Sequence, residues 1–209
     1  MGKNILPKVA KKIDVIVNEG IANYDIVPEI EKYLGHKLSD NQITLYLIYF
    51  AKPHGMKIAG TQYITDISND FETILANAIH EMMHPPFSAE NPRFTAARAK
   101  LVDDAFFQKN FANRNASYGY PTYEGFFEEN CVDALEVVIR EKFDLIKEGP
   151  RNYFRNHDGG ADGLGAAIYS LIQQEDYVSK GESFEEFLVR MIESGKLAAG
   201  RSKSCMIHL

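Results

Sequence analysis

Apolar residues along this chain of 209 residues follow strand-like patterns in one early region and helical spacing almost everywhere else. The first 35 residues carry Val9, Ile13 and Val17 at helical spacing, so we expect helices there. The run QITLYLIYF is rich in β-branched and aromatic residues and predicts a strand over 42–50. A second strand is expected over 56–67, where an internal glycine is typical of a bulge or a close backbone approach.

Helical spacing dominates the rest of the chain. Asn69, with Glu72 three residues later, has the form of a capping box and predicts a helix that runs to His84. Ser183 and Glu186 form a second capping box ahead of the last expected helix. The further helices are expected at 92–110, 122–147, 163–178 and 184–194.

This order of elements indicates an α+β fold, with a small mixed sheet early in the chain packed against a mainly helical remainder. No internal repeat, low-complexity tract or linker is visible, so we expect a single domain over 1–209. Hydrophobic residues make up 45% and charged residues 25%, which is ordinary for a globular protein.

The overall charge, the cysteines and the N-terminal stretch bear on which partners, metal sites and compartments are possible. A net charge of -6 argues against a nucleic-acid or anionic-membrane partner, and no apolar run is long enough to span a bilayer. Cys131 and Cys205 do not make a disulfide framework or a cysteine-type zinc site, which would need closely spaced cysteine pairs. The N-terminal stretch has no signal-peptide core, which fits a cytoplasmic chain and a mature exported one equally, so the compartment stays open.

The stretch NAIHEMMHPPF, residues 77–87, places His80 and His84 four positions apart with Glu81 between them. On a helix the two histidines fall about opposite an apolar stripe made of Phe71, Ile74, Leu75, Ala78, Ile79 and Met82. Two imidazoles one turn apart can bind one tetrahedral zinc ion, and Glu81 could then reach a water on that ion. The alternative is a pair of histidines on a solvated helix face.

Two prolines follow the second histidine directly. Pro85 disfavours the α conformation at His84, so the helix is expected to end at His84 or to kink there. The position of this ligand therefore depends on the loop that follows.

A third ligand is expected in the segment 125–136, GFFEENCVDALE. Glu129 and Asp133 lie four positions apart on one face of a predicted helix. Glu129 would bind the metal, and Asp133 would accept the free ring N–H of a ligating histidine. Glu128 is the rival ligand, although it is predicted to face the apolar side, where an unpaired carboxylate is costly. A solvated acidic face is the alternative interpretation of the pair.

Together, HEMMH and ENCVD resemble the gluzincin zinc metallopeptidases of the thermolysin and neprilysin type, in which a second helix bears Glu-x-x-x-Asp. The resemblance covers two short helices. It implies a zincin-like fold, one Zn²⁺ ion bound by His80, His84 and Glu129, and a peptide or protein substrate. Glu81 would be the general base that takes a proton from zinc-activated water and passes it to the leaving amine.

The resemblance also implies a donor for the oxyanion, which gluzincins take from a histidine or tyrosine elsewhere in the chain. We name His157 and Tyr123 as candidate catalytic donors to the oxyanion. Tyr120 and Tyr153 are further candidates for the same role. The strand before the motif helix would be the sheet edge that pairs with an extended peptide. The backbone positions that would bind it are Ile58, Ala59, Gly60 and Thr61.

The leading hypothesis is therefore a zinc-dependent peptide hydrolase. A zinc hydrolase acting on another amide, such as a cell-wall peptide, is the nearest alternative. A catalytically silent zincin-like domain that binds a peptide or protein is the alternative from a different class, and the intact Glu81 argues against it. A purely structural zinc site would favour four protein ligands and more cysteine.

Overall fold

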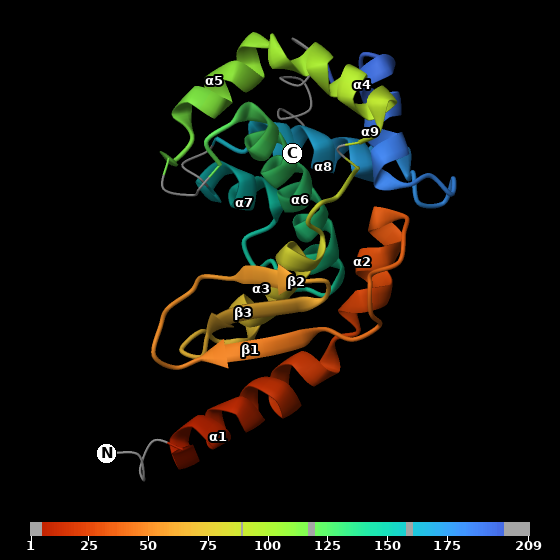
Figure 1. The fold of residues 1–209 in the computed structure, drawn as a ribbon. Helices are drawn as coiled ribbons and strands as arrows, with labels where there is room; N and C mark the ends of the chain where they lie inside the picture. The colour runs from red at the N-terminus through yellow and green to blue at the C-terminus, as the bar shows by residue number, and fades with distance from the viewer. Residues whose placement is uncertain (1–5, 89, 117–119, 158–160, 199–209) are drawn as a thin grey trace. The chain divides into compact units, whose positions relative to one another are not determined.

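The computed structural model describes residues 6–88, 90–116, 120–157 and 161–198 (Figure 1). Their backbone contacts separate into two units, one drawn from 1–31 and 37–82 and the other from 32–36 and 83–209. The division falls between Met82 and Met83, inside the His-Glu-x-x-His motif. The single domain expected over 1–209 stays a prediction, because internal contacts do not establish that a unit folds alone.

The first unit contains the three strands and the motif helix. Its elements are α1 (Leu6–Asp14), the π-helical η2 (Val15–Gly20), the 3₁₀-helical η3 (Ile21–Asn23), β1 (Thr44–Ile48), β2 (Met56–Ala59), β3 (Gln62–Asp66) and α3 (Phe71–Met82). Helix α2 (Ile26–Leu34) begins in this unit and ends in the other.

The sheet has the order β1-β3-β2, with β1 parallel and β2 antiparallel to β3. A small mixed sheet early in the chain is thus confirmed. The single strand expected over 56–67 is wrong, because β2 and β3 form a hairpin that reverses at Gly60. Gly60 has a φ of 52°, a left-handed conformation that glycine adopts without steric cost.

Helix α3 buries the predicted apolar stripe almost completely, with Ile74, Leu75, Ala78, Ile79 and Met82 all buried. The start of the helix differs from the prediction by one residue. Asp70 is the cap, since its carboxylate accepts a hydrogen bond from the Thr73 N–H at 2.8 Å. The Asn69 side chain instead donates to the Thr65 hydroxyl at 3.0 Å.

Asn77 connects α3 to the loop between β1 and β2 through a side-chain hydrogen bond. Its side-chain amide donates to the His54 carbonyl at 2.6 Å, and the Thr65 hydroxyl donates to the same carbonyl at 2.6 Å. Both Asn77 and Thr65 are buried, so these bonds replace water that the carbonyl would otherwise bind. The network sets how the motif helix lies on the sheet.

We expect Asn77→Ala to lower the free energy of unfolding by about 1–3 kcal/mol, because it removes a buried hydrogen-bond donor and leaves a gap. Urea unfolding followed by far-UV circular dichroism measures this, since the chain has no tryptophan for fluorescence. Glu90→Ala, in an exposed position, is the control and should stay within about 0.5 kcal/mol of wild type. Equal stability of the Asn77 variant and wild type would contradict the role of the network.

Within the described residues of the second unit, the regular secondary structure is all helical. Its helices are α4 (Pro92–Val102), α5 (Ala105–Asn113), α6 (Tyr123–Lys142), α7 (Pro150–Asn156), α8 (Gly163–Glu175) and α9 (Phe184–Glu193). Helix α6 packs on α8, where the Asn130 side chain accepts a hydrogen bond from the Gly165 N–H at 2.8 Å. Every residue of α6 from Asn130 to Ile139 is buried, so α6 is the central helix of this unit.

Several helix boundaries differ from the predicted ones. The helix expected over 92–110 is two helices, because the Asp104 carboxylate caps α5 by accepting from the Phe106 and Phe107 N–H groups. Helix α6 ends at Lys142 rather than near 147, and α7 was not predicted. The capping box of Ser183 before α9 is confirmed.

The mixed α+β class is therefore confirmed, while a zincin-like arrangement stays a prediction. Within the described ranges, no helix is both long and apolar enough to cross a membrane.

Candidate metal centre

The motif residues lie where α3 ends. His80 and Glu81 occupy its last turn and are partly buried, whereas the helix stops at Met82, two residues before His84. The expected end at His84 is thus slightly wrong, and His84 lies in the loop that leads into Pro85. Proline restricts the residue before it to extended conformations, which is consistent with a helix that stops short.

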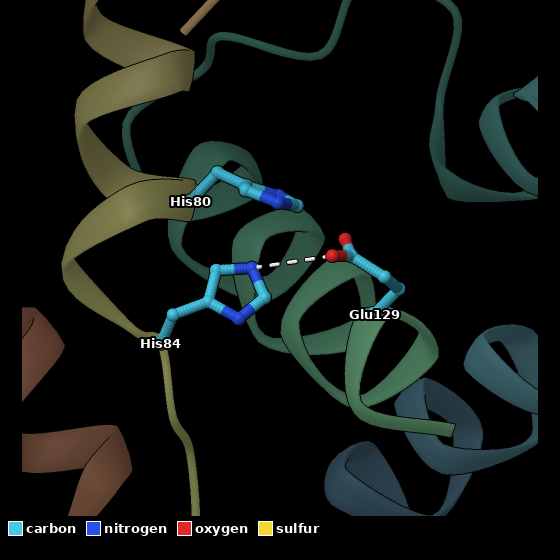
Figure 2. A group of neighbouring side chains, drawn as sticks. All are labelled: His80, His84 and Glu129. Atoms are coloured by element: carbon cyan, nitrogen blue, oxygen red, sulfur yellow. Dashed lines mark ion pairs between the residues drawn. The ribbon is translucent and has the colours of Figure 1, made fainter. Parts of the chain in front are cut away.

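Figure 2 shows the three predicted ligands, with His84 facing Glu129 of α6. His84 Nε2 is 3.7 Å from Glu129 Oε1, which is too long for a hydrogen bond. Nitrogen and oxygen ligands of one tetrahedral zinc ion lie about 3.4 Å apart, so this pair fits a shared ion.

Glu128 contacts the other side of the same imidazole. Its Oε1 lies 2.9 Å from His84 Nδ1, and 32% of its side chain is exposed. The prediction that Glu128 faces the apolar side of its helix is therefore wrong. Neighbouring helical residues are only about 100° apart, and both glutamate side chains are long enough to reach one imidazole ring.

Glu81 is held against the sheet of its own unit. Its Oε2 accepts a hydrogen bond from the Lys57 N–H of β2 at 2.8 Å. Burial lowers the pKa of the Lys57 ammonium, and the negative charge of Glu81 partly opposes that shift. The Glu81 side chain therefore has a defined position next to an edge strand.

The predicted peptide-binding residues divide between that edge strand and a turn. Ile58 and Ala59 lie in β2, an edge of the sheet, whereas Gly60 and Thr61 form the hairpin turn. The Thr61 carbonyl already accepts a hydrogen bond from the Thr44 N–H at 2.9 Å. The strand directly before the motif helix is the central β3, so the edge expected there is supplied by β2. Peptide binding by these residues stays a prediction.

Helix α6 has two acidic side chains that are buried within its unit. Asp133 and Glu136 are 3% and 5% exposed, and Glu136 pairs with Arg140 at 2.7 Å. Buried carboxylates are costly unless they are paired or bind a cation. Asp133 lies 3.9 Å from His157 Nδ1.

His157 lies among acidic side chains. Its Nδ1 is 2.5 Å from Asp162 Oδ2, and its ring stacks on Tyr153 with centroids 4.9 Å apart. Burial by itself lowers the pKa of His157, but the Asp162 hydrogen bond and the charges of Asp133, Asp162 and Glu136 outweigh it and raise the pKa to about 9. The ring is then an imidazolium at neutral pH, with both nitrogens acting as hydrogen-bond donors.

The raised pKa makes a contribution of His157 to stability depend on pH. Because the folded-state pKa exceeds the ordinary 6.5, this contribution is complete below pH 6.5 and is lost as the pH rises toward about 9. We expect the His157 ring proton resonances to titrate near pH 9, and Asp162→Asn to move their midpoint toward 6.5. Nuclear magnetic resonance measures both midpoints, and a wild-type midpoint near 6.5 would contradict the acidic environment.

The predicted tyrosine donors have other contacts. The buried Tyr123 hydroxyl donates to the Leu101 carbonyl at 3.1 Å, so its single proton is already used. An oxyanion role for Tyr123 requires that bond to break and stays a prediction. The Tyr120 ring packs on Phe126, and the Tyr153 ring packs on His157.

One acidic residue was missed from the sequence, and another was given a different role. Asp162, the partner of His157, lies five positions after it in a glycine-rich stretch where the spacing carries no periodic signal. Glu128 was recognised only as a rival ligand, and its contact with His84 Nδ1 was not expected. The orienting role predicted for Asp133 stays a prediction, because the carboxylate on the His84 ring nitrogen Nδ1 is Glu128.

No known protein family, curated protein or solved structure matches this chain significantly. The chemistry of the centre is therefore argued from its residues and their geometry.

Proposed function

We propose that this chain is a zinc-dependent peptide hydrolase, in which His80, His84 and Glu129 bind one Zn²⁺ ion and Glu81 is the general base. The observation that carries the proposal is the 3.7 Å approach of His84 Nε2 to Glu129 Oε1, between segments far apart in the sequence. Two motifs that suggest ligands separately thus meet at one imidazole. The resemblance to gluzincins supports the same ligand set.

Each protein group has a defined part in the proposed hydrolysis. Zinc, when bound, supplies a Lewis acid that polarises the scissile carbonyl and makes water more acidic. Glu81 takes the proton of the attacking water and returns it to the leaving amine. One of its oxygens is held by the Lys57 N–H, which fixes the carboxylate while the other oxygen exchanges the proton.

His157 is the proposed donor to the oxyanion. The imidazolium form, which its pKa of about 9 favours, offers a positively charged N–H to the developing negative charge. The stack on Tyr153 and the bond to Asp162 restrain the ring. An extended peptide would pair with the edge strand β2 near Ile58, which is 53% exposed.

One observation favours the silent binding domain as an alternative. The Glu81 carboxylate accepts a backbone hydrogen bond from β2, so it also has a structural use that needs no turnover. In that case the zinc centre and the sheet edge would bind a peptide without cleaving it.

The zinc content of the purified chain and its action on a peptide library test the proposal together. We expect about one zinc ion per chain, by plasma mass spectrometry, and cleavage that a chelator abolishes and added zinc restores. Native protein without zinc would overturn the metal centre. Bound zinc without cleavage of any peptide would favour the silent alternative.

A further inference from the structure

We propose that Glu128 is a positioning residue that orients His84 for zinc, and not a ligand. This inference rests on the proposed function, because it assigns a role within the same centre. In this assignment Glu128 binds the Nδ1 side of the His84 ring, and Glu129 lies on the Nε2 side.

The hydrogen bond at Nδ1 determines what Nε2 can do. Glu128 Oε1 lies 2.9 Å from His84 Nδ1, within hydrogen-bond range. An ionised carboxylate only accepts hydrogen bonds, so Nδ1 must carry the proton of a neutral ring. The lone pair is then on Nε2, the nitrogen that faces Glu129 at 3.7 Å.

The two distances differ in kind. The contact of Glu128 with Nδ1 has the length of a hydrogen bond, whereas the 3.7 Å between Glu129 and Nε2 exceeds a hydrogen bond and is close to the roughly 3.4 Å between two ligands of one zinc ion. A zinc ion bound by His84 would be held by Nε2, because the proton on Nδ1 occupies the other nitrogen. Glu129 is therefore the glutamate on the side where His84 can bind a metal.

His84 lies beyond the end of the motif helix, where a carboxylate on its ring can affect its orientation. Helix α3 ends at Met82, two residues before His84, and Pro85 follows directly. The His84 side chain is 20% exposed, so packing leaves part of the ring uncovered. A carboxylate on the second ring nitrogen restrains the orientation of the ring and makes it a stronger ligand.

The test compares Glu128→Ala and Glu128→Gln with Glu129→Ala and with Glu124→Ala, a control at an exposed position in the first turn of α6. Zinc affinity is measured by competition with a chelator between pH 6 and 8, and thermal unfolding is measured without metal. We expect Glu128→Ala to bind zinc about 10–100-fold more weakly than wild type, with unchanged unfolding of the metal-free protein. Glu128→Gln should recover part of the affinity, because its amide oxygen can accept the same hydrogen bond.

Three outcomes would overturn the inference. Zinc affinity of Glu128→Ala equal to that of wild type would show that Glu128 does not orient His84. Complete loss of zinc in Glu128→Ala, with retention in Glu129→Ala, would make Glu128 the ligand. Lower stability of both metal-free Glu128 variants with unchanged zinc affinity would assign Glu128 a structural role.

These outcomes are separable from failure of the proposed function. Wild-type protein that binds no zinc would refute the metal centre as a whole, and with it the role of Glu128. Wild-type protein that binds zinc but cleaves no peptide would leave the role of Glu128 supported by the affinity series alone.

Discussion

Replacing Glu81 by glutamine is expected to lower peptide hydrolysis by about 10²–10⁴-fold while the protein keeps its zinc, because the variant loses a general base but no ligand. Glutamine keeps the size of the side chain and an oxygen that can accept the Lys57 N–H. The substitution therefore removes proton transfer and preserves the contact with β2. Values of kcat/KM on a cleaved peptide, with zinc content from the same preparation, measure the effect.

Glu90→Gln is the control for this substitution. Glu90 is exposed in the loop before α4 and has no part in the proposed chemistry, so its variant should retain wild-type activity and zinc. Activity of Glu81→Gln within a few-fold of wild type would show that another group takes the proton. Loss of zinc from Glu81→Gln would show that Glu81 is a ligand.

Removing a zinc ligand has the second large expected effect. We expect His84→Ala and Glu129→Ala each to weaken zinc binding by more than the roughly 10–100-fold that loss of a ligand's hydrogen-bond partner costs. Zinc should be lost on dialysis and hydrolysis should disappear with it. Both residues are partly exposed, so their truncation leaves no buried cavity and the helical content should stay unchanged.

Zinc content after dialysis and far-UV circular dichroism are the two measurements. Glu124→Ala, in an exposed position on the same helix as Glu129, should keep its zinc. Stoichiometric zinc in both ligand variants would contradict the assigned centre. Zinc lost from His84→Ala but kept by Glu129→Ala would leave the third ligand to another residue.

Local sequence patterns predicted structure best where the residues of a single helix determine the feature. The apolar stripe of α3 and the capping box at Ser183 depend on spacings within a few residues, and both predictions are confirmed. The hairpin of β2 and β3 was missed because the strand-like pattern continues across Gly60. Whether a chain reverses there depends on pairing with a distant partner, and β1 and β2 flank β3 in the folded sheet.

Acidic residues were the hardest to assign. Asp104 could continue a helix or cap a new one, and its bonds to Phe106 and Phe107 show that it caps α5. Helical phase alone placed Glu128 on the apolar side, but the flexible side chain reaches His84 instead. A side chain with several rotatable bonds covers a wider arc than its position on the helix indicates.

Spacing along the chain was enough to predict the α+β class and the buried face of α3, and to propose residues for the metal centre, because periodicity and motif spacing are local properties. Three contacts became visible only in the folded chain: His84 Nε2 faces Glu129, Glu128 contacts His84 Nδ1, and Asp162 pairs with His157. Each of these contacts joins side chains through folded loops and helices, and no local spacing encodes the distance between them.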